Sequence, residues 1–351
     1  MYKMTYEEIK PYIERKLVTE QFHPEDQNVI ILNYTPECQF SGAWDEVTRQ
    51  CRGLIMNIVT GEILARPFPK FFNYGEFLEK GWPIPTEVPI VTEKYDGSLG
   101  ILYRLNGKSR VATRGSFISD QALWATAWLN EYCGELSFDS TLTYLFEIVY
   151  PANKIVVKYD FSGLVLLAAI DTAAGVERKP VIVSLEKPML RYRRQIPTTN
   201  LTALSKLDEP NSEGFVVFFP VANVRMKIKF PEYVRLHKIV TGLSSIGIWE
   251  SLFEGNELDI KDIPDELFKW IEEVKTDLKG KYVSIEEDAL RQYEKIVITC
   301  PQTRKEWAEG IMKMTNPSIG FTMLAGKDYS KIRWNMTRPS GKSIDKTDID
   351  L

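Results

Sequence analysis

The pattern of apolar and polar positions changes twice along this chain. Residues 5–17 place Ile9, Ile13 and Leu17 on one face at helical spacing, which predicts an amphipathic helix. From about residue 29 to residue 229, short apolar or alternating runs follow one another between turns rich in Gly, Pro, Asn and Asp, which is typical of β-strands. Beyond residue 241 the spacing becomes helical again. The pattern therefore predicts a β-rich part followed by a helical part.

The β-rich part contains nine expected strands and a helical interlude over residues 119–132 that begins with a Ser cap. The expected strands are NVIILNY, GLIMNIV, EVPIVTEKY, LGILYRL, LTYLFEIVY, KIVVKYD, GLVLLAAID, GFVVFFP and VRMKIKF. The expected later helices are IWESLFEG, DELFKWIEEVKTDLK, IEEDALRQYEKIV and TRKEWAEGIMKM. These elements predict an α+β fold, with one domain over residues 1–240, an all-α domain over residues 241–336 and a flexible tail over residues 337–351.

Composition excludes several classes of protein. Apolar residues make up 44% of the chain and charged residues 26%, which indicates a folded soluble protein rather than a disordered one. Apolar runs stay well short of the roughly 20 residues of a membrane helix, the N-terminus lacks a signal-peptide core, and the four Cys are widely spaced. We therefore expect a cytoplasmic protein with reduced thiols. With His23 and His237 as its only His residues, the chain is expected to use Lys, Arg and carboxylates for any chemistry.

The net charge of −4 argues at first against a protein that coats nucleic acid. However, residues 254–300 hold 13 acidic and 7 basic residues, so this stretch carries −6 and the rest of the chain +2. Within that remainder, residues 225–238 contain five bases and one acid. The charge is therefore compatible with an enzyme that grips a few phosphates at one site.

The segment EKYDGS, residues 93–98, has two interpretations. The apolar runs VPIV and LGILY on either side of its Asp-Gly pair favour a β-hairpin. Such a turn would also hold Lys94 rigidly, and a fixed lysine can act as a nucleophile if nearby cations or a metal ion favour loss of its proton.

A second cluster of charged residues is expected from strand pairing. If GFVVFFP and VRMKIKF form a hairpin that closes around residue 221 or 222, Glu213 lies close to Lys229, with Lys227 one pair further in. A carboxylate beside several lysines is either a structural ion pair or part of a metal-phosphate site. Glu147, inside the apolar run LTYLFEIVY, likewise needs a partner, which is as easily structural as functional.

Taken together and in order, these segments resemble the covalent nucleotidyltransferases, the superfamily of polynucleotide ligases and mRNA capping enzymes. The matching motifs are Lys94-Tyr95-Asp96-Gly97, which fits the nucleophile motif KxDG, then Phe146-Glu147, Glu213-Gly214 and Lys227-Ile228-Lys229. The flanking segments narrow the resemblance to the phage RNA ligase 1 family. They are Cys51-Arg52-Gly53, Arg66-Pro67 running on to Lys70-Phe71-Phe72-Asn73, Thr113-Arg114-Gly115-Ser116, Pro151 to Val156, and Tyr233 with Leu236-His237. The resemblance covers about residues 30–240.

This resemblance implies a nucleotidyltransferase fold of the ligase and capping-enzyme type, built on antiparallel sheets, and the activity of an ATP-dependent RNA ligase. Lys94 would attack the α-phosphate of ATP to form lysyl-AMP, the AMP would pass to an RNA 5′-phosphate, and an RNA 3′-hydroxyl would then displace it. The implied cosubstrate is ATP, the metal Mg²⁺ or Mn²⁺, and the partner single-stranded or broken RNA in RNA or tRNA repair. No membrane is implied, and the protein would be a monomer. It would be cytoplasmic, and a phage-encoded protein would act in the cytoplasm of the host.

The resemblance also assigns roles to individual residues. The implied catalytic residues are Lys94, Glu213, Lys227 and Lys229. The implied ATP-binding residues are Tyr34, Arg52, Lys70, Lys94, Glu147, Lys227 and Lys229. Lys227 and Lys229 would lie at the α-phosphate and discourage protonation of Lys94. Glu147 and Glu213 would serve the metal ion, directly or through water, and Glu147 has a ribose contact as its alternative role. Arg114, Ser116 and Tyr233 are candidates for binding phosphate or RNA.

Two other functions stay open on the sequence. One is another polynucleotide ligase, or a GTP-using capping nucleotidyltransferase, of the same superfamily. The helical reading of the C-terminal part weighs against these because no OB-fold segment is recognisable after residue 229. The other is a non-catalytic module that binds RNA ends.

Overall fold

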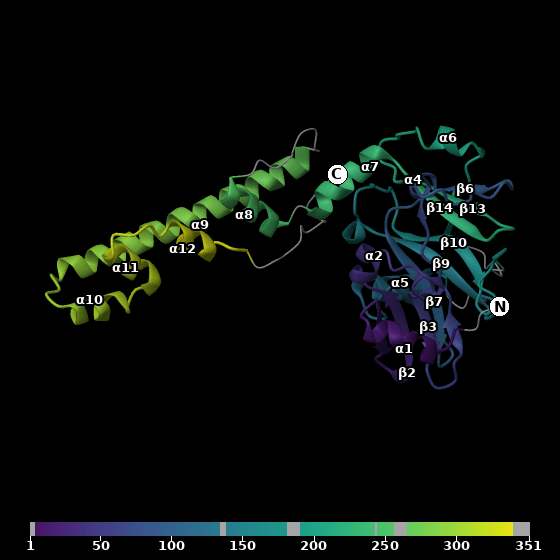
Figure 1. Cartoon of the computed structure of the whole chain (residues 1–351), viewed down its shortest axis with the longest axis horizontal. Coiled ribbons are helices and arrows are strands. Elements are labelled where there is room, and N and C mark those ends of the chain that lie inside the picture. Colours follow the sequence, from purple (N-terminus) through teal and green to yellow (C-terminus); the bar gives the residue numbers. More distant parts are fainter. Residues whose placement is uncertain (1–3, 134–137, 181–189, 243, 256–264, 340–351) are drawn as a thin grey trace. The chain divides into compact units, whose positions relative to one another are not determined.

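Three β-sheets precede a group of helices in the structure, a computed structural model that describes residues 4–133, 138–180, 190–242, 244–255 and 265–339 (Figure 1). The chain divides into two compact units, Met1–His237 and Lys238–Leu351. The first unit contains the sheets and the second is helical. The predicted α+β class is therefore confirmed.

The inner strands of the first sheet are buried on both faces. Its four antiparallel strands follow the order β1-β2-β3-β4. Ile30 and Leu32 of β2 face a core that includes Ile9 of the first helix, whereas Val29 and Ile31 face a core shared with the second sheet. The elements are α1 (Tyr6–Glu14), β1 (Val18–His23), β2 (Asp26–Tyr34), α2 (Pro36–Ser41), α3 (Glu46–Gln50), β3 (Arg52–Asn57) and β4 (Ile63–Ala65). Burial on both faces explains why NVIILNY is a continuous apolar run rather than an alternating one.

Glu147 lies on a strand of the second sheet. Its main path is β11-β10-β9-β7-β8, with β12 paired in parallel beside β10. Along β9, Phe146 and Ile148 pack towards helix α5, whereas Leu145 packs on the opposite face, between this sheet and the first. The elements are β7 (Ser98–Leu105), β8 (Lys108–Ala112), α5 (Asp120–Tyr132), β9 (Leu142–Val149), β10 (Gly163–Asp171), β11 (Glu177–Arg178) and β12 (Arg191–Tyr192). Because side chains alternate along a strand, Glu147 shares the face of Leu145.

The third sheet carries the predicted hairpin. Its order is β5-β14-β13-β6, and β13 pairs with β14 so that Gly214 lies opposite Lys229 and Val216 opposite Lys227. This register is the one expected from closure around residues 221 and 222, so that prediction is confirmed. The elements are β5 (Phe72–Asn73), α4 (Tyr74–Glu79), β6 (Ile90–Glu93), α6 (Leu201–Leu204), β13 (Gly214–Phe219), β14 (Val224–Lys229) and α7 (Pro231–Gly242).

Two strand predictions are wrong. The runs VPIV and LGILY do not form a hairpin: β6 pairs with β13 in the third sheet, and β7 pairs with β8 and β9 in the second. The run KIVVKYD, residues 154–160, forms no strand. Val156 and Val157 are nevertheless buried, and their backbone N–H groups bind the side chain of Asp96, which takes the place of a neighbouring strand.

The second unit is helical, as predicted, but two expected helices are one. DELFKWIEEVKTDLK and IEEDALRQYEKIV both lie in α9, which continues through Gly280 at a cost of roughly 1 kcal/mol relative to Ala. The helices are α8 (Ser245–Glu254), α9 (Asp265–Ile298), α10 (Arg304–Ile311), α11 (Pro317–Leu324) and α12 (Ser330–Met336). Of the predicted flexible tail, residues 340–351 lie outside the described residues. Thr337 is buried and accepts a hydrogen bond from the indole N–H of Trp249.

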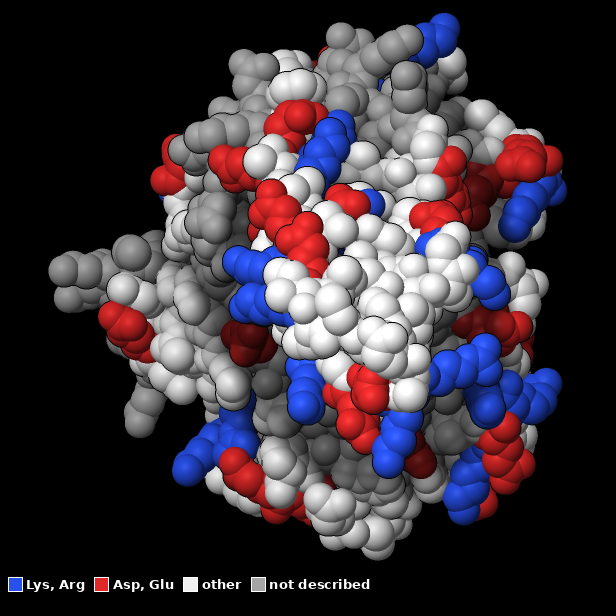
Figure 2. Space-filling view, turned by 90° about the vertical axis from the view of Figure 1, so that its left-hand side faces the viewer, with Lys and Arg blue, Asp and Glu red and all other residues white. Residues whose placement is uncertain are grey.

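Figure 2 views the molecule from the side on which α10 and α11 are drawn in Figure 1. On this side, acidic and basic side chains surround an uncharged area. The exposed apolar side chains of the second unit include Ile298, Met312 and Phe321. No helix in the described part of the chain is long and apolar enough to span a membrane.

Candidate active site

Lys94 lies where the chain crosses between two sheets. β6 of the third sheet ends at Glu93, and β7 of the second sheet begins at Ser98. The backbone N–H of Lys94 donates to the carbonyl of Gly214 on β13 at 2.9 Å. The lysine is therefore fixed to the third sheet while the residues after it reach the second.

The side chain of Asp96 holds this crossing in place through three hydrogen bonds. Its Oδ2 accepts hydrogen bonds from the backbone N–H groups of Val156 (2.8 Å) and Val157 (2.9 Å), and its Oδ1 accepts one from the hydroxyl of Tyr233 (2.7 Å). The side chain is only 3% exposed. Asp96 thus holds the turn in place rather than facing a ligand, which is a physical reason for an aspartate two residues after the lysine.

Two glycines permit the close approach of the backbones here. A Cβ on Gly97 would lie 2.5 Å from the carbonyl oxygen of Ile148, and a Cβ on Gly214 would lie 2.0 Å from that of Ile228. Gly214 also has φ +134°, which side chains rarely adopt. The glycines of both motifs are therefore required by the packing that brings Lys94 and Glu213 together.

Glu213 joins two of the predicted lysines. Its Oε2 lies 2.8 Å from Lys94 Nζ and its Oε1 lies 2.8 Å from Lys229 Nζ. Burial alone would raise the pKa of Glu213, but the two ammonium groups outweigh it and hold that pKa below its ordinary value. Burial likewise lowers the pKa of Lys94, and the carboxylates of Glu213 and Glu147 outweigh it, so the pKa of Lys94 is raised.

The expected repulsion between Lys94 and Lys227 is present, but the carboxylates outweigh it, so the pKa of Lys94 is not lowered in the free protein. The cation that loses its proton readily is Lys227. Burial, then repulsion from Lys94 and Lys229, lowers the pKa of Lys227 to about 7. It has no salt bridge within the described residues.

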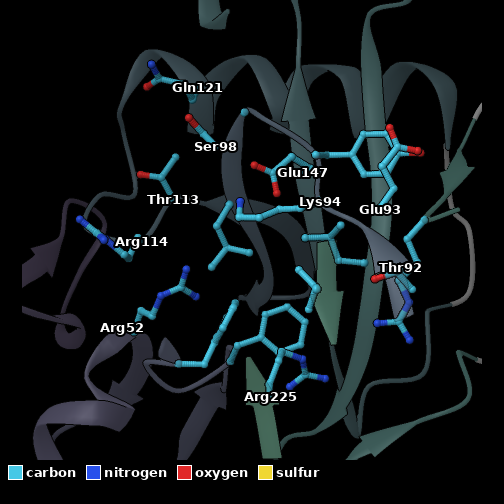
Figure 3. A pocket seen from close by; sticks show the side chains of 18 of the residues that line it. Arg52, Thr92, Glu93, Lys94, Ser98, Thr113, Arg114, Gln121, Glu147 and Arg225 are labelled. Atoms are coloured by element: carbon cyan, nitrogen blue, oxygen red, sulfur yellow. The ribbon is translucent and has the colours of Figure 1, made fainter. Parts of the chain in front are cut away.

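Glu147 is buried beside these charges. Burial raises its pKa to about 8, against the opposing attraction of Lys94. Figure 3 shows its carboxyl group next to the Lys94 side chain, near the centre of the pocket. Glu147 can therefore act as a neutral hydrogen-bond donor near pH 7, or as a carboxylate if a bound cation lowers its pKa.

Arg52, Tyr34 and Arg114 come together on the first-sheet side of the site. Arg52 begins β3, Tyr34 ends β2, and Arg114 Nη1 donates to the Tyr34 hydroxyl at 3.0 Å. Nη1 of Arg52 and Oδ1 of neighbouring Asn33 are buried without hydrogen-bond partners among the described residues. Such unpaired polar atoms are costly, which favours a polar ligand at this position.

Lys70 lies beside this group but against aromatic rings. Its Nζ is 4.8 Å from the ring centroid of Trp44 and 5.5 Å from that of Tyr34. Burial, and repulsion from Arg52 among other charges, lowers its pKa.

Two of the predicted RNA contacts have structural partners. Ser116 closes a turn, because its carbonyl accepts from the N–H of Thr113 (2.9 Å) and its hydroxyl accepts from that of Ile118. Tyr233 is 3% exposed, and its hydroxyl is bound to Asp96. Arg114 is exposed and lines the pocket of Figure 3.

A cavity of about 530 Å³, the reaction cavity, lies beside part of this group (Figure 3), whereas Tyr34, Lys70 and Ser116 are not among its lining residues. Arg52, Lys94, Arg114 and Glu147 are among its lining residues. Lys227, Lys229 and Tyr233 line a neighbouring cavity of about 600 Å³. Glu213 bridges Lys94, on the first cavity, and Lys229, on the second.

Sequence reasoning missed the pairing of Arg225. This side chain is buried, forms salt bridges with Glu177 together with Arg193, and lies 4.1 Å from the ring centroids of Phe68 and Phe218. Arg193 and Arg225 both line the reaction cavity. The sequence does place Arg225 on the same strand as Lys227 and Lys229. It gives no indication of the partner Glu177, because that residue is 48 positions away in the chain.

The acidic residues present suit a hydrated divalent cation rather than a protein cage. Among the described residues no group of three or more His, Cys, Asp or Glu is placed to hold a metal ion. Glu147 lines the reaction cavity, and Glu213 is bound to Lys94, which also lines it. Mg²⁺ often keeps several waters while binding one or two carboxylates and a substrate phosphate.

Known RNA ligases share sequence with this chain. The profile of the RNA ligase family, of the T4 RNA ligase 1 type, matches residues 50–233. RNA ligase 1 of bacteriophage TS2126 is 33% identical over 162 residues, covering 42% of this chain and 41% of that protein. The RNA ligase of Rhodothermus phage RM378 is 21% identical over 358 residues, covering 79% and 81%.

The solved structure of an archaeal ATP-dependent RNA ligase has a TM-score of 0.47 and 14% identity, covering 92% of this chain and 96% of that one. Several matches are partial, since this chain spans 55% of a Thermovibrio ammonificans protein with 26% identity over 216 residues. The family profile covers more than half of the chain, including the segments that carry Lys94, Glu147, Glu213 and Lys229. The chain therefore belongs to the RNA ligase family of the phage RNA ligase 1 type.

Proposed function

We propose that this chain is an ATP-dependent RNA ligase that joins 5′-phosphate and 3′-hydroxyl RNA ends. The observation that carries the proposal is the position of Lys94, ion-paired through Glu213 to Lys229, at a cavity that also contains Arg52 and Glu147. A lysine held among cations suits attack on a phosphate, because phosphoryl transfer depends mainly on positioning and charge stabilisation. The family of the chain supports the same reaction.

In the first step, Lys94 Nζ attacks the α-phosphorus of ATP. The N–P bond forms, the bond from phosphorus to the bridging oxygen of the β-phosphate breaks, and pyrophosphate leaves with that electron pair. Lys94 must first give up its extra proton and its bond to Glu213, because a protonated amine has no lone pair for attack. The second step moves AMP to an RNA 5′-phosphate, and in the third an RNA 3′-hydroxyl displaces AMP.

The cations have separate tasks in this proposal. Lys227 and Lys229 stabilise charge at the α-phosphate, while Arg52, Lys70 and Tyr34 serve the outer phosphates and the nucleotide. The unpaired Nη1 of Arg52 fits such a contact. Arg114 is the exposed candidate for RNA phosphate, with Ser116 and Tyr233 acting through the structure around them.

Glu213 and Glu147 are the residues that would serve Mg²⁺ or Mn²⁺. A divalent cation would neutralise charge on the phosphates. Glu213, once released by Lys94, has a free oxygen for a water of the metal, and Glu147 either does the same or donates to a ribose hydroxyl.

We further propose that residues 1–240 form the adenylyltransferase domain, that residues 241–336 form a helical C-terminal domain, and that the chain acts as a monomer. Tyr34 through Tyr233, the residues assigned above, all lie in the first unit. Broken RNA, including tRNA, in the cytoplasm is the proposed natural substrate.

The test is a labelling experiment. Incubation of the full chain with α-labelled ATP and Mg²⁺, followed by denaturation, is expected to leave label on the protein, and Lys94→Ala is expected to remove it entirely. Sealing of single-stranded 5′-phosphorylated RNA should then follow.

Other results would point elsewhere. Label from GTP, or better sealing of nicked DNA, would favour another member of the superfamily. Label that survives in Lys94→Ala, or wild-type protein that binds RNA ends without taking label, would refute the proposal.

A further inference from the structure

A second cavity, the aromatic cavity, adjoins the reaction cavity. It has a volume of about 510 Å³, within the roughly 300–1,000 Å³ of ligand pockets. Six aromatic residues lie among those that line it: Trp44, Phe68, Phe71, Phe72, Phe77 and Trp82. Phe72 and Phe77 are buried, whereas Trp44 and Trp82 retain partial exposure. The indole rings are therefore available to an occupant without unfolding the core.

The lining is cationic as well as aromatic. Arg49, Lys70, Lys80 and Arg225 line the aromatic cavity, and no acidic residue does so among the described residues. Lys80 Nζ lies 4.8 Å from the ring centroid of Trp82. In the described part of the chain, Arg49, Lys70 and Lys80 form no salt bridge with a carboxylate. A cavity that merely filled a gap in the core would have no need of these cations.

Such a lining fits a nucleotide. Aromatic faces stack on bases of any sequence, and cations without carboxylate partners hold phosphates. An apolar metabolite would use the rings but not the cations, and an inorganic anion would use the cations but not the rings.

The position of the cavity relates its occupant to the reaction. Phe68, Phe71 and Arg225 line both the aromatic cavity and the reaction cavity. Figure 3 shows Arg225 at the margin of the reaction cavity. Its Nε is buried without a hydrogen-bond partner among the described residues. A nucleotide in the aromatic cavity would therefore be a near neighbour of the phosphates that react beside Lys94.

We propose that the aromatic cavity binds an unpaired nucleotide of the RNA strand, with its base against Trp82 and its phosphate near Lys80. The proposal rests on the proposed RNA ligase function and adds to it a binding site for the strand. It assigns the part of the aromatic cavity around Trp82 and Lys80 to RNA, and it leaves Lys70, which also lines that cavity, to the phosphates of ATP.

The test separates RNA binding from adenylation. Binding of a short 5′-phosphorylated single-stranded oligoribonucleotide is titrated without ATP, and lysyl-AMP formation is measured with ATP alone. Trp82→Ala is expected to weaken RNA binding about 5- to 150-fold. Lys80→Ala is expected to weaken it and to reduce the slope of log K against log salt by about 0.7, the value for one phosphate contact on a single strand. Both variants should still form lysyl-AMP.

The matched controls are Phe22→Ala and Lys108→Ala. Phe22 is 41% exposed on β1 and Lys108 is exposed at the start of β8, and neither lines the aromatic cavity. They are expected to bind RNA as the wild type does. If Trp82→Ala fails to fold, the exposed position of Lys80 keeps its variant decisive.

Three outcomes have distinct meanings. Wild-type RNA affinity and salt slope in Lys80→Ala, or wild-type affinity in folded Trp82→Ala, would overturn the proposal. A loss of lysyl-AMP formation that equals the loss of RNA binding would assign the cavity to ATP instead and would also overturn it. Absence of lysyl-AMP in the wild type would refute the ligase function, while the RNA titration would still test the cavity.

Discussion

The Nζ atom of Lys94 donates a 2.8 Å hydrogen bond to Oε2 of Glu213, whose other oxygen is bound to Lys229. The proposed nucleophile is therefore held in its protonated form before ATP binds. The same contact fixes the orientation of the Glu213 side chain, which is 3% exposed. Glu213 is therefore already in position when Lys94 is released. Adenylation is consequently expected to depend on pH through the contact.

Replacing Glu213 with Gln should make this dependence visible. The carboxylate raises the pKa of Lys94, so adenylation by the wild type is expected to rise with pH as Lys94 loses its proton. In Glu213→Gln the rate should fall roughly 10²–10³-fold, as for loss of one stabilising group, while the midpoint of the rise in kcat/KM for ATP moves to lower pH. Glu209→Gln, at an exposed position, serves as the control. A midpoint that stays in place would contradict the role given to the contact.

The Lys227 side chain is expected to lower the free energy of unfolding of the protein near pH 7. Its pKa is about 7 in the folded protein against 10.5 for a free lysine, so the unfolded chain binds more protons between these values. The wild type should therefore become more stable as pH rises through this window. Lys227→Met should flatten that rise, increase the free energy of unfolding at pH 7, and slow adenylation.

Denaturant unfolding at several pH values measures the effect. Lys206→Met, at an exposed site, should change stability by no more than about 0.5 kcal/mol. Lower stability of Lys227→Met than of the wild type at pH 7 would show that the buried ammonium stabilises the fold.

Glu147 should tolerate an amide better than a methyl group. Its pKa of about 8 means that the carboxyl is largely neutral at pH 7, and Gln keeps its shape and a donor group. We expect Glu147→Gln to retain much more adenylation than Glu147→Ala. Equal loss in both variants would instead indicate that the ionised carboxylate is required, as for a metal contact.

The same substitution has a consequence for stability. Because the folded pKa is raised from 4.5 to about 8, the wild type should lose stability as pH rises between these values. Glu147→Gln should remove this loss, which thermal unfolding across the range would measure.

Tyr233→Phe should separate a positioning role from RNA binding. The hydroxyl donates to the buried Asp96, so its removal leaves Oδ1 of that carboxylate short of a partner, at a cost of about 1–3 kcal/mol. We expect lower stability and a lower kcat for adenylation, with RNA affinity unchanged. A fall in RNA affinity without loss of stability would restore Tyr233 as an RNA contact. Tyr192→Phe, on an exposed ring, is the control.

Many of the elements, and the closeness of Lys229 to Glu213, follow from local sequence pattern. Alternation along VRMKIKF and the turn that joins it to GFVVFFP fix the register of one hairpin, because a strand's side-chain period is two and its turn is local. The helix over residues 120–132 and its Ser119 cap were equally readable, since capping depends on adjacent residues. The ordered motifs then indicated the family.

The place where the chain crosses between sheets depends on contacts that form only in the folded protein. The Asp-Gly pair after Lys94 reads as a hairpin, but β6 and β7 join different sheets because Asp96 binds backbone N–H groups 60 and 61 residues away. The raised pKa values of Lys94 and Glu147 likewise arise from burial and from charges distant in the chain, and the aromatic cavity is lined by segments far apart in the sequence. Burial and long-range charge depend on the assembled fold, and a local pattern of residues does not contain them.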